Sequence, residues 1–253
     1  MKEEFARQYE NLQEWHWWFR GRQRILESVL SHEMKQQPKL RIVSLGSGPG
    51  SQLGWLASYA RNGFVVGIDT ERTHASKQYP SIYSVAGKIE AAPLASQKFD
   101  AVLALDVLEH LEDDAGGLHE ASRLLAPGGL LLVTVPALPI LWGKQDVVSH
   151  HHRRYTRRAL AAAFTQAGLV PAQIVYFNVL LLPLIAAIRW TRKLKGSAKD
   201  DSDFSDNQPG AINSFLTHLF ASERHFVRRI PFPLGVSLMG IYRKGAQCAP
   251  SVH

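Results

Sequence analysis

The chain has little sulfur and no long apolar run. Its 253 residues include one cysteine, Cys248, and three methionines. A single cysteine excludes a disulfide within the chain, which fits a reducing, cytoplasmic setting. The N-terminus is charged at Lys2 and Glu3 and shows no apolar leader. The apolar stretch 179–188 contains Pro183 and is too short to span a bilayer, which takes about 20 residues.

The chain also has fewer acidic than basic residues. The 29 Lys and Arg exceed the 22 Asp and Glu, so the formal net charge is +7. This balance suits an anionic partner such as nucleic acid, a membrane surface or a phosphorylated substrate, although a basic soluble surface is the simpler interpretation. The hydrophobic fraction of 45% is ordinary for a globular protein. The length fits one large domain or one domain with an appendage.

The most informative stretch is an apolar run, residues 40–45, that leads into a glycine-rich turn. Gly46, Gly48 and Gly50 give the spacing Gly-x-Gly-x-Gly, and a second apolar run, 64–68, ends on Asp69. Glycines let a backbone approach a ligand closely, and a carboxylate can accept both hydroxyls of a ribose. Because residue 51 is serine, the spacing argues against a dinucleotide such as NAD and disfavours an oxidoreductase.

Alternating apolar and helix-like segments predict an open, doubly wound α/β sheet with its ligand beyond the carboxyl ends of the strands. A turn at 127–129 leads into one of the strands. The predicted strands lie near 40–45, 64–69, 82–86, 99–105, 130–135, 172–177 and 236–242. The predicted helices lie near 1–35, 52–61, 71–78, 112–125, 156–166 and 211–227, and residues 196–210 predict a mobile loop.

Four segments, VSLGSGPGS, VVGIDTE, FDAVLALDVLEHL and LLAPGGLLLVTVP, follow one another at intervals that resemble the class I S-adenosylmethionine-dependent methyltransferases. The resemblance covers about residues 40–177. Two further motifs, HWWFRGR at 16–22 and the D-x4-H-x-R-R-Y spacing from Asp146 to Tyr155, are similar to a bacterial, type-11-like subgroup. The resemblance implies a Rossmann-like sheet of about seven strands, mostly parallel with an antiparallel last strand, and helices on both faces.

The resemblance also implies three parts. Residues 1–37 would form a helical cap over the cofactor site. Residues 38–178 and 230–245 would form the methyltransferase core. Residues 179–229 would be an apolar, helical insertion on the acceptor side, with the loop 196–210 in it.

The cofactor implied is S-adenosylmethionine. The glycine loop would pass under its methionine part, Asp69 and Thr70 would hold its ribose, and Ile89 would lie against its adenine. Trp17, Trp18 and Phe19 would close the site from the cap, and Arg20 or Arg22 would pair with the methionine carboxylate. The full set of expected cofactor residues is Gly46, Ser47, Gly48, Gly50, Asp69, Thr70, Ile89, Leu105, Asp106, Trp17 and Arg22.

Two positions depart from the family's usual pattern. Ser44 stands where an acidic residue commonly precedes the glycine loop, and Lys88 stands where an Asp often meets the adenine. Both changes remove negative charge from a site for a cation. A non-catalytic protein that keeps the methyltransferase fold and binds the cofactor weakly is therefore the alternative to an enzyme.

The expected reaction is methyl transfer to a small or amphiphilic, possibly anionic acceptor, such as a lipid-linked sugar, a quinone precursor or an envelope glycan. His151 is the first candidate for a general base and His110 the second, although His110 also fits a structural role; Tyr155 completes the catalytic set. Arg153, Arg154 and Asp146 are expected to bind the acceptor. Residues 179–195 could contact a membrane peripherally, no metal site is expected, and nucleic acid is not favoured as the acceptor.

Overall fold

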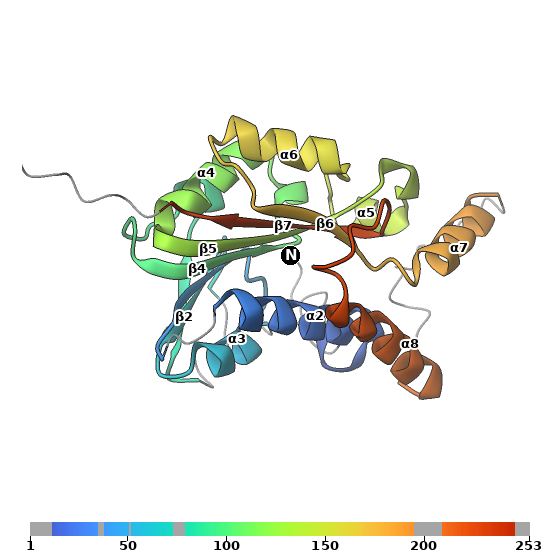
Figure 1. Cartoon of the computed structure of the whole chain (residues 1–253), viewed down its shortest axis with the longest axis horizontal. Helices are drawn as coiled ribbons and strands as arrows, with labels where there is room; N and C mark the ends of the chain where they lie inside the picture. The colour runs from blue at the N-terminus through green and yellow to red at the C-terminus, as the bar shows by residue number, and fades with distance from the viewer. Residues whose placement is uncertain (1–11, 35–37, 51, 73–78, 195–208, 246–253) are drawn as a thin grey trace, which may run out of the picture.

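The computed structural model describes residues 12–34, 38–50, 52–72, 79–194 and 209–245. Its centre is a seven-stranded sheet in the order β3-β2-β1-β4-β5-β7-β6 (Figure 1). β7 pairs antiparallel with both β5 and β6, and the other neighbours are parallel, which confirms the predicted sheet. The strands are Arg41–Leu45 (β1), Phe64–Asp69 (β2), Ile82–Ala86 (β3), Phe99–Leu105 (β4), Leu125–Pro136 (β5), Gln173–Phe177 (β6) and Ser237–Arg243 (β7).

Helices cover both faces of the sheet, because the central strands are apolar on both sides and must be buried twice. Two helices, α4 (Asp114–Leu124) and α6 (Arg157–Gln166), lie on one face (Figure 1). The opposite face carries α2 (Trp17–Glu33), α3 (Leu53–Ala60) and α8 (Ala211–Ser222). α5 (Lys144–Val148) follows β5, α7 (Leu182–Leu194) follows β6, and short 3-10 turns lie at Ile89–Ala91, Leu108–His110, Pro139–Leu141 and Glu223–His225.

Most predicted elements are confirmed, and the differences have local causes. β5 begins at Leu125 rather than near 130, because Leu125 already pairs with Phe99 before the register shifts. The helix expected to reach 227 ends at Ser222 and continues as a 3-10 turn. The apolar stretch 179–188 becomes helical from Leu182. Most of the helix expected at 71–78 and of the loop expected at 196–210 lies outside the described residues.

Side-chain hydrogen bonds attach the cap and α7 to the sheet. Asn213 of α8 accepts from the backbone N–H of Trp17 at 2.8 Å, which ties α8 to the start of α2. The buried Glu223 carboxylate accepts the backbone N–H groups of Asn178, Val179 and Leu180 at 2.7–2.9 Å, so it fixes the loop between β6 and α7. Among the described residues, every helix is too short or too polar to cross a membrane.

Candidate functional site

A cavity of about 830 Å³ lies at the carboxyl ends of β1, β2 and β4 and extends between α2, α7 and α8. Parallel α/β sheets place ligands at this edge. Most residues expected to bind cofactor or acceptor line it, although they come from segments far apart in the chain. Those on the wall are Gly46, Ser47, Gly48, Asp69, Thr70, Ile89, Leu105, Asp106, Trp17, Arg22, His110, His151 and Arg154, and those not on it are Gly50, Asp146, Arg153 and Tyr155.

The glycine loop needs its glycines at two positions for different reasons. Gly46 has φ +63°, and a Cβ there would lie 2.6 Å from the Val107 side chain. Gly48 has φ +54°, and a Cβ there would meet no atom within 4 Å. At Gly46 the loop therefore turns tightly against the residue that follows β4. At Gly48 the backbone has no side chain and faces open space, so a ligand can approach it closely.

The polar groups beside this loop fit the cofactor that the resemblance implies. Asp69 at the end of β2 accepts from the Gly48 N–H at 2.7 Å and from the Thr70 N–H at 2.7 Å. The Thr70 hydroxyl also donates to Asp69, at 3.1 Å. A carboxylate has about four acceptor positions, so Asp69 keeps capacity for one ribose hydroxyl, and for a second if the Thr70 hydroxyl turns away. The Ser47 hydroxyl is buried without a hydrogen-bond partner among the described atoms, and Ile89 offers an apolar wall.

Ser44 and Lys88, the two residues that depart from the family's usual pattern, lie in different environments. Ser44 is fully buried in β1 beneath the loop, where the Gln52 side chain donates a long hydrogen bond of 3.5 Å to it. Lys88 is exposed and is not part of the cavity wall. The position next to the glycine loop that lacks a negative charge is therefore Ser44. Lys88 adds no positive charge to the cavity wall.

The cap reaches the cavity through α2. His16 caps this helix by accepting from the Trp18 N–H at 3.2 Å, and burial lowers the pKa of His16 to about 4. Trp17 and Trp18 line the cavity, and the Arg22 guanidinium lies 4.3 Å from the centre of the Trp18 ring. Arg22 also pairs with Asp106 at the end of β4. Arg22 and Asp106, each expected to bind the cofactor, thus form an ion pair that joins the cap to the sheet.

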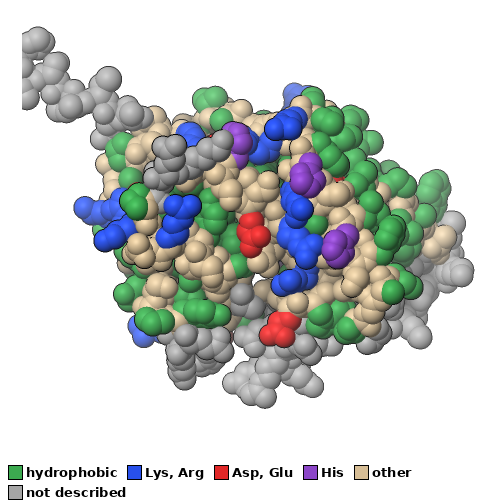
Figure 2. Space-filling model, turned by 60° about the horizontal axis from the view of Figure 1, so that its bottom comes forward, with side chains coloured by type: hydrophobic (Ala, Val, Ile, Leu, Met, Phe, Trp, Pro, Cys, Tyr) green, Lys and Arg blue, Asp and Glu red, His purple; other side chains and the backbone are tan. Residues whose placement is uncertain are grey.

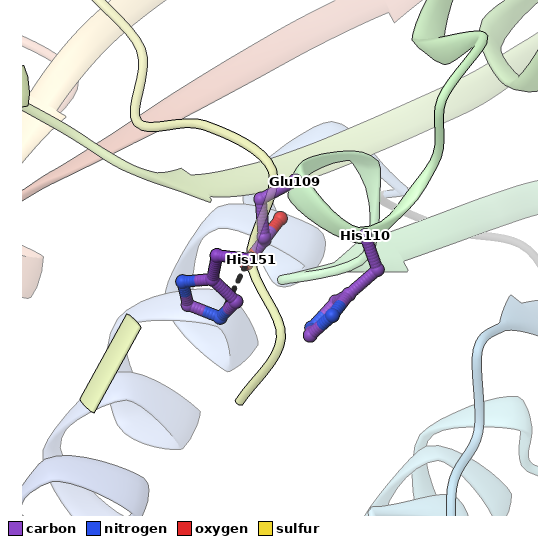
Figure 3. Close-up of side chains that lie close together, drawn as sticks. All are labelled: Glu109, His110 and His151. Atoms are coloured by element: carbon purple, nitrogen blue, oxygen red, sulfur yellow. Dashed lines mark ion pairs between the residues drawn. The ribbon is translucent and has the colours of Figure 1, made fainter. Parts of the chain in front are cut away.

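His151 is held in a defined orientation on the far side of this bridge. Its Nδ1 lies 2.9 Å from the buried Asp146 carboxylate, and its other ring nitrogen faces Glu109 at 4.0 Å (Figure 3). Burial by itself raises the pKa of Asp146, but the hydrogen bond from His151 and the charge of Arg154 outweigh burial and lower this pKa to about 2. An ionised carboxylate on Nδ1 fixes the tautomer in which Nε2 is free to accept a proton.

Glu109 and His110, which follow β4, complete this cluster (Figure 3). Glu109 is fully buried, neither of its carboxyl oxygens has a hydrogen-bond partner among the described atoms, and burial raises its pKa to about 8. Burial and the neighbouring His151 lower the pKa of His110 to about 4, which makes it a weak base. One ligand atom from each of Glu109, His110 and His151 lies within 4.8 Å of the others, so the cluster could hold a cation if its side chains moved together.

Four residues expected to act in the site do not line the cavity. Tyr155 is buried and donates to the Asp114 carboxylate at 2.7 Å; burial and this bond raise its pKa, so it is a packing residue. Arg153 pairs with Asp114 and donates to the carbonyls of Leu111 and Glu112, because its side chain points away from the cavity. The other two residues are Asp146 and Gly50. Asp146 orients His151 instead of meeting the acceptor, and the backbone of Gly50 shapes the turn into α3.

Sequence reasoning missed three polar residues of the wall. Glu109 was overlooked within the DVLEHL motif, although a carboxylate directly after an apolar strand was a usable signal. Asn178 follows β6 with φ +56°, and its side-chain amide is buried without a partner among the described atoms. Arg189 of α7 donates to the Leu141 carbonyl and lies 3.7 Å from Asp146. Their convergence depends on the β6–α7 connection, which sequence spacing does not reveal.

The end of the cavity away from the glycine loop is apolar. It is lined by Leu181, Leu184, Ile185 and Ile188 of the β6–α7 segment, and by Ile212 and Leu216 of α8. The cavity therefore has a polar end, where backbone and carboxylate groups converge, and an apolar end, where two helices face each other. His151 and Arg154 belong to the region between these ends.

Comparison with known proteins identifies the core. A model of the methyltransferase domain matches residues 43–133. The chain is 31% identical over 159 residues to a probable S-adenosylmethionine-dependent methyltransferase of Mycolicibacterium smegmatis (61% of this chain, 58% of the relative). It is 32% identical over 170 residues to the malonyl-[acyl-carrier protein] O-methyltransferase of Enterobacter lignolyticus (62% and 63%). The chain spans between about half and three-fifths of the length of four of the curated relatives that it matches.

Solved structures share the fold at low sequence identity. A SAM-dependent methyltransferase from Thermotoga maritima superposes with a TM-score of 0.56 at 18% identity, covering 96% of this chain and 97% of that one. A geranyl diphosphate methyltransferase in complex with SAM gives a TM-score of 0.56 at 15% identity, covering 88% and 85%. Together with the strand order, these likenesses show the fold of class I methyltransferases, and the matched domain makes residues 43–133 similar to S-adenosylmethionine-dependent methyltransferases.

Proposed function

We propose that this protein transfers a methyl group from S-adenosylmethionine to a hydroxyl or carboxyl oxygen of a small or amphiphilic acceptor. The observation that carries the proposal is His151, which lines the same cavity as the glycine loop and whose Nδ1 is held by Asp146. An oriented imidazole is the group that an oxygen acceptor needs if it must lose a proton. The names of two relatives, the malonyl-[acyl-carrier protein] O-methyltransferase and a ubiquinone biosynthesis O-methyltransferase of Caulobacter, 36% identical over 105 residues, support oxygen as the acceptor atom.

Each part of the wall has a separate task in this reaction. The cofactor supplies an activated methyl group when it is bound. Asp69 and the bare backbone at Gly48 hold the cofactor, and Trp17 and Trp18 exclude water from the cavity. His151 accepts the acceptor's proton at Nε2, while Asp146 stabilises the imidazolium that forms. Arg154, which donates to Asp146 at 2.7 Å, keeps that carboxylate ionised and in place.

Release of S-adenosylhomocysteine from S-adenosylmethionine tests the proposal. The full chain is incubated with phenols and carboxylic acids, each with and without an alkyl tail. We expect turnover with at least one of these oxygen acceptors and a product methylated on oxygen. A protein that binds cofactor but methylates amine acceptors instead would contradict the choice of oxygen and the role of His151.

A non-catalytic binding protein is the second candidate, and Ser44 favours it. This residue leaves the buried position before the glycine loop without charge. If the cofactor site has degenerated, Ser44→Asp should tighten S-adenosylhomocysteine binding strongly and the natural chain should show no turnover. If the site is functional, the natural chain binds without this change and S44D alters affinity little.

A further inference from the structure

Exposed apolar side chains concentrate around the apolar end of the cavity. Among the described residues, fifteen large hydrophobic side chains are exposed. Ten of these lie in the three segments that surround the cavity mouth: Ile140, Trp142, Val147, Val148, Leu180, Leu184, Ile188, Trp190, Ile212 and Phe215. Apolar patches of this kind on a soluble fold usually mark a binding surface.

These segments form one continuous mouth. Leu184, Ile188 and Ile212 line the cavity and are also exposed, so the cavity wall continues onto the outer surface. Trp190 and Phe215 lie farther out on α7 and α8, and are 69% and 64% exposed. Arg189 joins α7 to the segment before α5 through its bond to the Leu141 carbonyl. A ligand that enters here passes apolar side chains before it reaches His151.

The mouth exposes little negative charge. The sequences of α7 and α8 contain no Asp or Glu, and in α5 Lys144 is exposed whereas Asp146 is buried. On the face that carries α2 and α3, a group of hydrophobic side chains lies at the end of the molecule that bears α7 and α8, and a band of Lys and Arg borders it (Figure 2). The whole chain has a net charge of +7. An apolar surface flanked by cations complements an anionic lipid surface, which attracts nearby Lys and Arg side chains.

We propose that the mouth formed by α5, α7 and α8 docks on an anionic membrane surface, and that the acceptor is an amphiphile whose tail enters between α7 and α8. The identity of the acceptor rests on the proposed function, whereas docking does not. Trp190 and Phe215 lie in the lipid interface, and Leu184 and Ile188 contact the tail. The acceptor's polar head then lies beside His151 and Arg154, at the polar end.

Co-flotation of the full chain with vesicles tests the docking. Vesicles of phosphatidylcholine containing phosphatidylglycerol are compared with vesicles of phosphatidylcholine alone. We expect binding to the anionic vesicles that weakens with added salt, because screening reduces the charge attraction. The variant Trp190→Ser with Phe215→Ser should lose about tenfold or more in binding. Val170→Ser is the matched control, since Val170 is 84% exposed and precedes β6, whereas α7 follows that strand.

Titration of each variant with S-adenosylhomocysteine separates docking from the reaction. Unchanged cofactor binding in the double variant shows that it is folded, and the flotation result then reports the surface alone. Absence of the natural chain from floated anionic vesicles overturns the proposal. An equal loss in V170S and in the double variant overturns it as well. Failure of the proposed function would appear instead as no turnover by a chain that still floats.

Discussion

The two ends of the cavity are built in different ways. At the polar end, the glycine loop and Asp69 follow consecutive strands, β1 and β2, and a few short motifs supply most of the wall. At the apolar end, α7 and α8 contribute to one wall; Glu223 bonds the loop before α7, and Asn213 bonds α8 to the cap. The polar end carries the groups that the proposed reaction uses, and the apolar end is where we propose that the acceptor's tail binds. Changes at one end should therefore leave the other unaffected.

The largest effect is expected between the two ends, at His151. His151→Ala should lower kcat by about 10² to 10⁴-fold, because removal of a positioned general base costs that much. Asp146→Asn should lower kcat less, because His151 stays but its tautomer is no longer fixed. Steady-state turnover with titration of S-adenosylhomocysteine checks both. His152→Ala is the matched control, since His152 is exposed and its backbone, rather than its ring, bonds the Glu109 carbonyl.

The next largest effect is expected at the polar end. Asp69→Asn keeps the shape of the side chain but removes its charge, so cofactor affinity should fall about 10- to 100-fold, as for a lost charge-assisted hydrogen bond. Calorimetric titration with S-adenosylhomocysteine measures this change. Vesicle binding by D69N should match that of the natural chain. If D69N loses vesicle binding as well, the two ends are not independent.

Sequence reasoning was sufficient at the polar end for a physical reason. The strand–glycine–helix sequence fixes the local backbone, so Gly46, Gly48 and Asp69 could be placed from spacing alone. The role of Asp146 could not, because it depends on a loop that returns from β5 past Glu109 and pairs with Ala137. Tyr155 and Arg153 lie in the same motif as His151, yet the chain's alternating path turns them toward Asp114.

A smaller effect is expected at the apolar end. Ile188→Ser with Ile212→Ser should raise KM for an alkyl-tailed acceptor about fivefold, since one buried methylene contributes about 0.8 kcal/mol. KM for the same acceptor without the tail should not change. Initial rates with the paired acceptors measure the difference. Equal KM increases for both acceptors would mean that these side chains shape the cavity rather than bind a tail.

A stability effect of a few degrees is expected at Glu109. Its pKa is about 8 in the folded protein and 4.5 ordinarily, so the unfolded chain loses the proton first as pH rises. The stability linked to the neutral carboxyl is complete below pH 4.5 and is lost as pH rises through 8. The Tm of the natural chain should therefore fall relative to that of Glu109→Gln between these values. Parallel Tm curves for the two proteins would contradict the buried, neutral carboxyl.

No effect is expected from metal removal. If His151 acts as the base, dialysis against EDTA leaves turnover unchanged. Lost turnover that returns with one divalent cation would instead assign Glu109, His110 and His151 as its ligands. Because ligand atoms of these three residues lie within 4.8 Å of one another, the EDTA experiment distinguishes a metal site from a general base.

Calorimetric titration of the full chain with S-adenosylhomocysteine tests the central claim most directly. The claim is that the Gly48 backbone, the Ser47 hydroxyl and the Asp69 carboxylate form one cofactor site, and that Ser44 does not prevent binding there. We expect saturable binding in the micromolar range that D69N weakens and that the apolar-end variants leave unchanged. A folded chain that shows no binding at millimolar S-adenosylhomocysteine would contradict the claim.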